Sequence, residues 1–179
     1  MLFAAALLAG FVTAFANEDH PIQGDAMKLH LTSTAFAEGQ PIPHRHAFHD
    51  DNLSPALQWS NVPPAAKSLA LICDDPDAPM GIWVHWVIYD LPPSAAGLSE
   101  DVPKSPELAS GVRQGVNDFK RLGYGGPAPP PGRPHRYFFK LYALDLKPGL
   151  KPGLTKKELL KAMEGHVLAE GQLMGTYQR

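Results

Sequence analysis

Proline and glycine interrupt this chain so often that they limit the folds it can adopt. The sequence holds 19 prolines and 16 glycines among its 179 residues. Proline breaks helices and central strands, and glycine marks turns, so this composition favours strands joined by ordered loops over a helical bundle. With 44% hydrophobic residues, the chain still has enough apolar side chains for the core of one domain of ordinary size.

Three apolar segments have the length and composition of β-strands. Residues 68–73 form a continuous apolar run, which suits a strand buried on both faces. Residues 82–91 and 136–145 are two further strong strands, and residues 27–32 and 57–59 are shorter ones. Strands therefore dominate the predicted fold.

The C-terminal segment changes to a helical period. Thr155 and Glu158 have the spacing of a capping box. Apolar residues then recur near helical spacing at Leu159, Met163, Val167 and Leu173. Gly165 and Gly171 each weaken such a helix by about 1 kcal/mol relative to alanine, so it requires tertiary packing. We predict a mostly β domain with a peripheral C-terminal helix.

Charge and cysteine content exclude several classes of protein. Lys and Arg number 16, Asp and Glu number 18, and the formal net charge is -2. A domain that binds nucleic acid through bulk charge is usually basic, so we expect no nucleic-acid partner. Cys73 is the single cysteine, so an intramolecular disulfide and a cysteine-based zinc site are both excluded.

The first segment resembles a secretory signal. Residues 1–16 carry no charged side chain and end in Ala14-Phe15-Ala16, which fits the small-x-small rule for signal peptidase. We predict cleavage after Ala16, a folded domain over residues 17–179, and a periplasmic or secreted location. A buried N-terminal helix and a retained membrane anchor are the alternatives, although the apolar run is short for a bilayer.

Polar residues gather where the three strong strands begin or end. The motif DPDAP at residues 75–79 places two carboxylates, Asp75 and Asp77, on a loop that its prolines stiffen. In the WVHW strand, a period of two predicts one shared face for Trp83, His85, Val87 and Tyr89. In HRYFF, the same period predicts one face for His135, Tyr137 and Phe139, and the opposite face for Arg136. Alone, each motif is a weak signal, because an acidic turn or a core histidine is a more ordinary explanation than a site.

Taken together and in this order, the motifs resemble the phosphatidylethanolamine-binding protein family. The bacterial YbhB/YbcL branch, also called Raf-kinase-inhibitor-like, is the most similar. The resemblance covers nearly all of residues 27–179 and includes LTSTAFAEGQPIP (31–43), NLSPALQW (52–59), KSLALICDDPDAP (67–79), WVHW (83–86), GYGGPAPPPGRPHRYFFKLYALD (123–145) and GHVLAEGQLMGTYQR (165–179).

The resemblance implies a fold and a pocket. It implies a central antiparallel sheet, a smaller second sheet and a C-terminal helix, with a small anion-binding pocket at one edge. By the motif match, the ligand-binding residues are Asp75, Asp77, Pro79, Trp83, His85, Gly126, Pro127, His135 and Tyr137. It also implies a cis bond between Ala78 and Pro79. Many bacterial relatives have cysteine where Ala128 stands, so thiol chemistry at the pocket rim is excluded here.

Two carboxylates beside an anion should repel it. Either the aspartates raise the pKa of His85 and His135 so that both imidazoles donate, or one aspartate pairs with the ammonium of a zwitterionic head group. The first alternative predicts that binding strengthens as the pH falls from about 8 to about 6.

Three functions fit these residues. The leading one is an exported, non-catalytic protein that binds phosphate, a similar small anion or a phosphoethanolamine-like head group. The second is an inhibitor or regulator of a protein partner such as a protease, which an exposed apolar patch near the pocket would favour. The third is a hydrolase that uses the Asp, His and Tyr side chains, although the sequence shows no Ser nucleophile elbow. We expect no cofactor, and the resemblance leaves a homodimer open.

The segment that contains His44, His46 and His49 is rich in histidine. A solvated loop is its ordinary interpretation, and a weak surface metal site is the alternative, because His46 and His49 could converge in a turn. Nothing in the sequence fixes such a geometry, so we predict no metal site.

Overall fold

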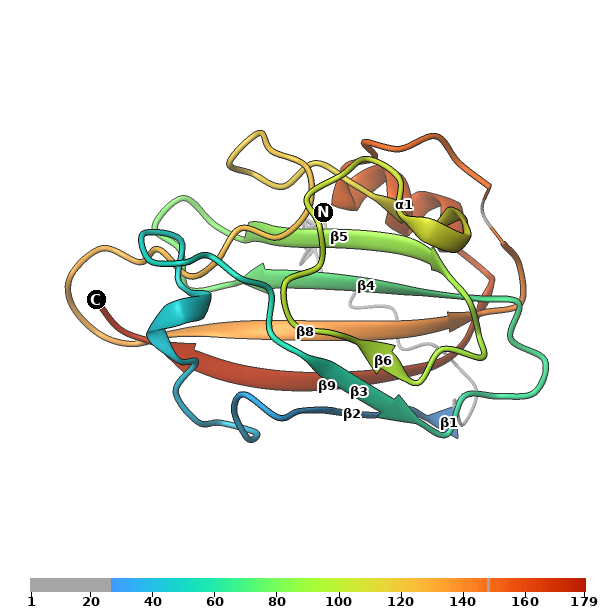
Figure 1. Cartoon of the computed structure of the whole chain (residues 1–179), viewed down its shortest axis with the longest axis horizontal. Coiled ribbons are helices and arrows are strands. Elements are labelled where there is room, and N and C mark those ends of the chain that lie inside the picture. The colour runs from blue at the N-terminus through green and yellow to red at the C-terminus, as the bar shows by residue number, and fades with distance from the viewer. Residues whose placement is uncertain (1–26, 148) are drawn as a thin grey trace, which may run out of the picture.

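The computed structural model describes residues 27–147 and 149–179, in which nine strands and one α-helix surround a layered core (Figure 1). In chain order, the elements are β1 (Met27–Lys28), β2 (His30–Ser33), the 3-10 helix η1 (His44–His46), β3 (Leu57–Ser60), β4 (Ser68–Asp75), β5 (Trp83–Leu91), β6 (Gly97–Leu98), the 3-10 helix η2 (Ala109–Gly111), β7 (Arg113–Gln114), β8 (His135–Leu144), α1 (Lys156–Met163) and β9 (Val167–Tyr177).

The strands form two sheets. The large sheet has the order β1-β9-β8-β4-β5-β7, and the small sheet has the order β2-β3-β6. All neighbours pair antiparallel except the short β1, which pairs parallel with β9. The mostly β architecture with a central sheet and a smaller second sheet, predicted from the sequence, is confirmed.

The core lies on both faces of the large sheet. On one face, Phe139 of β8 and Trp86 of β5 belong to a buried cluster that also contains Trp59 of the small sheet. On the other face, Ile72 of β4 packs in a second cluster with Leu159 of α1. Because β4 lies between these two layers, all eight of its residues are buried, as its continuous apolar sequence predicts.

The predicted C-terminal helix is too long. The capping box is confirmed, but α1 ends at Met163, and both Val167 and Leu173 lie in β9. Gly165 takes a left-handed φ of 77° just after the helix and lets the chain leave it. The residues that follow pair with β8 along its length, and these long-range contacts outweigh the weak helical period.

A β-bulge interrupts the alternation of side chains between the two faces of the large sheet along β5. Asp74 pairs with Val84 and Cys73 pairs with Trp86, so His85 is an extra residue between two paired positions. The predicted alternation across β5 is therefore wrong. Val87 and Tyr89 belong to the cluster beside α1, whereas the ring of His85 lies against Tyr137 on the other face.

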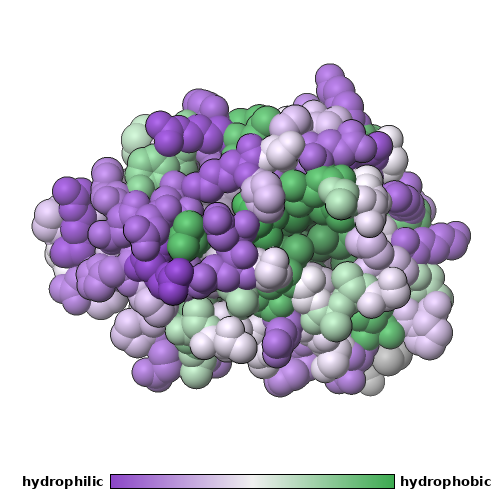
Figure 2. Space-filling model, in the orientation of Figure 1, coloured by the Kyte–Doolittle hydropathy of each residue, from purple (hydrophilic) through white to green (hydrophobic). Residues whose placement is uncertain are grey.

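Several of the loops that join the strands lie at one end of the molecule, on the left in Figure 1. The β4–β5 loop, the segment that leads into β8, η1 and the C-terminus all lie there. Figure 2 shows the same face, with hydrophilic residues over most of its left end and apolar residues in a hollow near its middle.

The predicted signal sequence, residues 1–16, lies outside the described residues. Within the part of the chain that the structure describes, no helix is long and apolar enough to cross a membrane.

Candidate functional site

The loops at this end of the large sheet enclose a cavity of about 300 Å³, which we call the end cavity. Its lining residues are Asp75, Ala78, Pro79, Met80, Trp83, His85, Phe119, Ala128, Pro129, Pro130 and His135. Five of the predicted ligand-binding residues are among them, namely Asp75, Pro79, Trp83, His85 and His135. The lining combines two imidazoles and one carboxylate with walls that are otherwise apolar.

Strand β8 begins at His135, whose imidazole pairs with Asp75 at the end of β4. Nδ1 of His135 lies 2.8 Å from Oδ2 of Asp75, and both side chains are almost fully buried. The other carboxylate oxygen, Oδ1, accepts the backbone N–H of Asp77 at 2.8 Å. Asp75 thus has a partner on each oxygen, which fixes its orientation and that of the His135 ring.

The bulged residue His85 is held by backbone carbonyls. Its Nδ1 lies 2.7 Å from the Gly125 oxygen and 3.1 Å from the Gly126 oxygen, and only 3% of the residue is exposed. Burial lowers the pKa of His85 below its ordinary value of 6.5, and this effect outweighs the opposing influence of the carbonyls, Asp75 and Asp118. The aspartates act in the expected direction, but the expected net rise of the His85 pKa is wrong because burial has the larger effect.

Asp77 does not line the end cavity. Its carboxylate forms a two-pronged ion pair with Arg136, with Nε at 2.8 Å and NH2 at 2.9 Å, and it also accepts the Arg136 backbone N–H at 3.0 Å. Arg133 lies 3.9 Å away. The hydrogen bonds from Arg136 are the main cause that lowers the pKa of Asp77 to about 2. Only one of the two predicted carboxylates, Asp75, therefore lines the end cavity, so the cavity carries less negative charge than the sequence predicted.

The remaining three predicted residues support the cavity from behind. Tyr137 is buried, with its ring 5.1 Å from that of His85, and burial raises the pKa of its hydroxyl. Gly126 donates its N–H to Asn52 at 2.8 Å, and Pro127 accepts the N–H of Phe48 at 2.9 Å. A Cβ on Gly126 would lie 2.0 Å from the His46 carbonyl oxygen, so the close approach of these two segments requires glycine.

Sequence reasoning missed one complete wall of the cavity. Phe119 stacks on Phe48, with 4.2 Å between ring centroids, and its edge contacts Trp83 and His85. Phe119 belongs to the long irregular segment between β7 and β8, which has no periodicity from which to infer its direction. Met80, Pro129 and Pro130 also lie in loops and were missed for the same reason.

Two details of the rim bear on the expectations from the resemblance. The described residues contain no cis peptide bond, so the Ala78–Pro79 bond is trans and the expected cis bond is wrong. Ala128 lies in the cavity lining, where its side chain contributes a methyl group.

The histidine-rich segment has a structural role. His46 is fully buried in η1, and its Nδ1 lies 2.9 Å from the Leu53 oxygen. His44 lies 3.0 Å from the Tyr177 hydroxyl. Among the described residues, no group of three or more His, Cys, Asp or Glu side chains could hold a metal ion.

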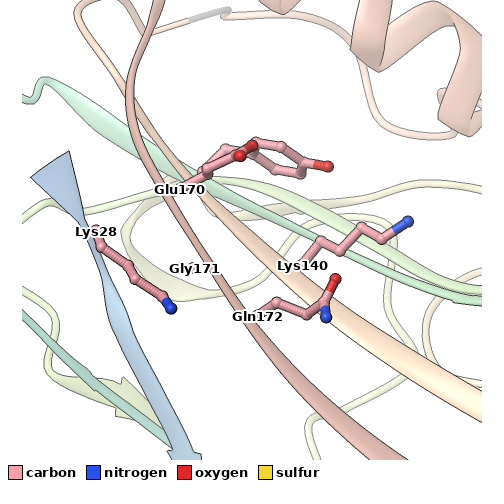
Figure 3. A pocket seen from close by; sticks show the side chains of 6 residues that line it. Lys28, Lys140, Glu170, Gly171 and Gln172 are labelled. Atoms are coloured by element: carbon pink, nitrogen blue, oxygen red, sulfur yellow. The ribbon is translucent and has the colours of Figure 1, made fainter. Parts of the chain in front are cut away.

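A larger hollow of about 550 Å³, which we call the sheet groove, lies along β9 and β8 (Figure 3). Figure 3 shows Lys28 and Lys140 on opposite sides of the β9 backbone at Gly171. Lys140 is already paired with the buried Asp74, which also binds Lys156 of α1. This sheet groove lacks histidine, and its charges tie α1 to the sheet, so we place the candidate site at the end cavity.

This arrangement, two packed β-sheets with a small cavity among the loops at one sheet end, is the fold of a class of small binding proteins. The sequence matches the family model described as phosphatidylethanolamine-binding protein over residues 32–178. The chain belongs to this family.

Relatives support the assignment. A UPF0098 protein of Methanothermobacter thermautotrophicus is 53% identical over 84% of this chain and 99% of its own, and one of Aquifex aeolicus is 46% identical over 84% and 89%. The crystal structure of CT736, a phosphatidylethanolamine-binding protein homologue from Chlamydia trachomatis, matches with a TM-score of 0.78 and 41% identity over 86% of this chain and 99% of its own. YbcL of E. coli, described as a member of the mammalian family, matches with a TM-score of 0.79 and 31% identity over 85% and 99%.

Proposed function

We propose that this chain is an exported, non-catalytic binding protein whose end cavity holds a small anionic group of the phosphate class. The observation that carries the proposal is the pair of imidazoles, His85 and His135, that open onto one small cavity beside the buried Asp75. The signal-like sequence of residues 1–16 supports export.

The hydrogen bonds of the lining suit an anion that arrives with a proton. Each imidazole has its Nδ1 against a protein acceptor, so only Nε2 is left to contact a ligand. Because Nδ1 already donates its hydrogen to that acceptor, Nε2 accepts a hydrogen bond while the ring is neutral and donates only when the ring is an imidazolium. Burial lowers the pKa of His85 and favours its neutral ring, so we expect anion binding to strengthen as the pH falls toward 6 and the phosphate group takes up a proton.

The test is an NMR titration of the purified full chain at pH 6, first with inorganic phosphate and then with phosphoethanolamine. We expect saturable shifts at His85, His135 and the loop that follows Asp75. The His85→Ala variant should lose them, and the matched control His30→Ala, which changes an exposed histidine of β2, should keep them. The absence of shifts at millimolar ligand would contradict the proposal.

The absence of catalysis is a separate part of the proposal. Asp, His and Tyr side chains are close together here, and they are the usual groups of acid–base hydrolysis. Turnover of p-nitrophenyl phosphate by the wild type, lost in His85→Ala, would show that the cavity is an active site instead.

One observation favours a protein partner as the second candidate. Met80 is 92% exposed and Ile82 is 60% exposed, and both lie in the β4–β5 loop, where Met80 also lines the end cavity. Exposed apolar side chains beside a cavity are typical of interaction sites. If this loop blocks a protease, the wild type should inhibit a panel of purified proteases, and a Met80→Ser, Ile82→Ser variant should not.

A further inference from the structure

The two imidazoles of the end cavity differ in what holds them. His85 lies against the carbonyl oxygens of Gly125 and Gly126, which can only accept, so its Nδ1 carries a hydrogen. His135 lies against the carboxylate of Asp75. Among the described residues, neither Nε2 has a hydrogen-bond partner, and neither is among the fully buried atoms. Both Nε2 atoms are therefore left for a ligand.

The groups beside the two rings differ in charge, so the two Nε2 atoms have different hydrogen-bonding roles. Nδ1 of His135 lies 2.8 Å from the Asp75 carboxylate, so an imidazolium at this position would be paired with an opposite charge and would donate from Nε2 to an anionic oxygen. His85 instead contacts neutral carbonyls and the rings of Tyr137 and Phe119.

The ionisable groups that face His85 are Asp75 of β4, Asp118 of the segment before Phe119, and Tyr137 of β8. The two carboxylates favour an imidazolium, but burial outweighs them and lowers the pKa of His85. Neutral His85 offers a lone pair on Nε2, so it accepts a hydrogen bond where His135 donates one.

We propose that the end cavity selects a phosphate monoester that carries one proton over a phosphate diester. The inference rests on the proposed function, since it names the kind of phosphate that the cavity takes. A singly protonated monoester has an anionic oxygen to accept from His135 and a P–OH group to donate to His85. A diester has the anionic oxygens but no P–OH group, so it would cover the Nε2 of His85 without giving it a partner.

The walls are compatible with the organic part of such an ester. Pro79, Trp83 and Phe119 form apolar surfaces beside the imidazoles, and the exposed Met80 lies in the same lining. An alkyl or aryl group on the phosphate would remove these surfaces from water while the phosphate contacts the two Nε2 atoms. The lining therefore fits a small monoester better than bare phosphate.

The experiment compares methyl phosphate with dimethyl phosphate by calorimetry on the full chain at pH 6. The second pKa of a phosphate monoester is about 6, so roughly half of the methyl phosphate carries the required proton. We expect the monoester to bind at least about tenfold more tightly than the diester, which is the discrimination typical of one unpaired buried polar group. Phosphoethanolamine against glycerophosphoethanolamine repeats the comparison and separates a free metabolite from a lipid head group.

Two variants test which histidine is responsible for the preference for the monoester over the diester. His85→Phe keeps a ring of similar shape but removes the acceptor, so the ratio of monoester affinity to diester affinity should fall toward one. His135→Gln removes the charged donor, so both ligands should weaken together, and His30→Gln should change neither. Circular dichroism of each variant checks that the fold is retained.

The outcomes separate the inference from the proposed function. Equal affinity for the two methyl esters, or tighter binding of the diester, overturns the selection for a monoester and leaves the anion site standing. Failure of both esters to bind overturns the anion site and the selection together. If the His85→Phe variant still prefers the monoester, the inference is also overturned, because another group would then accept the hydrogen bond from P–OH.

Discussion

His85 links the protonation of the end cavity to the stability of the fold. Its ring is buried by Tyr137 and Phe119, and its Nδ1 fastens the segment at Gly125 and Gly126 to β5. Burial lowers the pKa of His85 in the folded protein, whereas in the unfolded chain the group returns to its ordinary value of 6.5. Below that value the unfolded chain takes up a proton more readily than the folded protein does.

Because the pKa of His85 is lower in the folded protein than in the unfolded chain, its contribution to stability is fully present above pH 6.5 and is lost as the pH falls below that value. The free energy of unfolding of the wild type should fall by up to about 1.4 kcal/mol per pH unit from this one group. Urea unfolding from pH 8 to pH 5 measures the slope. His85→Gln should remove it and the exposed His30→Gln should not, and a slope unchanged in His85→Gln would contradict the assignment.

Asp77 is a residue whose side-chain position could not be predicted from its motif. The resemblance placed Asp77 and Asp75 in the pocket together, and the sequence shows both on one loop. The ion pair with Arg136 depends on where β8 begins relative to the end of β4, which is a long-range fact. Only the packed sheet shows that Arg136, which was correctly placed on the face opposite His135, draws Asp77 away from the cavity.

Among the elements, α1 is the one whose start is fixed by a local signal. The Thr155 side chain accepts the N–H of Glu158, and the Glu158 carboxylate accepts the N–H of Thr155 at 2.8 Å. These bonds satisfy two backbone groups that the first turn of a helix leaves unpaired. Capping chemistry lies within four residues, which explains why the sequence predicted the start of α1 but not its end.

Replacing the cap should destabilise the protein without altering the end cavity. Thr155→Ala removes the hydroxyl that accepts the Glu158 N–H, and loss of such a cap costs about 1 kcal/mol. Thermal and urea unfolding measure the loss, with Lys157→Ala on the exposed side of α1 as the control. Phosphate-induced shifts at His85 should be the same in both variants, and a weakened response in Thr155→Ala would show that α1 helps to shape the cavity.

The end of the helix and the bulge of β5 are decided by the whole sheet. Val167 and Leu173 have helical spacing, yet pairing with β8 places them in a strand. Likewise, the sequence WVHW alternates as a regular strand, and the extra residue at His85 becomes visible only in its register against β4. The three strong strands could be predicted because their existence depends on local hydrophobicity. Register and bulges could not, because they depend on partners far away in the chain.

At the scale of the whole molecule, the large sheet has a fully buried centre and carries the end cavity among the loops at one end. Strand β4 is hydrogen-bonded to β5 on one side and to β8 on the other, and all of its residues are buried. Its amides can exchange with solvent only when the sheet opens as a whole. The loops that line the end cavity are held by fewer backbone bonds, so they can open without unfolding the sheet.

Hydrogen exchange should therefore show two regions with different responses to ligand. Without ligand, β4 and the middle of β8 should exchange slowest, and the β4–β5 loop and residues 123–134 should exchange much faster. Methyl phosphate at pH 6 should slow exchange in these two loops by the factor that its affinity dictates, because a bound state cannot open. Strand β1 and the sheet groove at Lys28 and Gln172 should be unaffected. Protection at the sheet groove instead would place the ligand-binding site on that face of the sheet. Uniform slowing of exchange in the whole chain would mean that the ligand acts only through global stability.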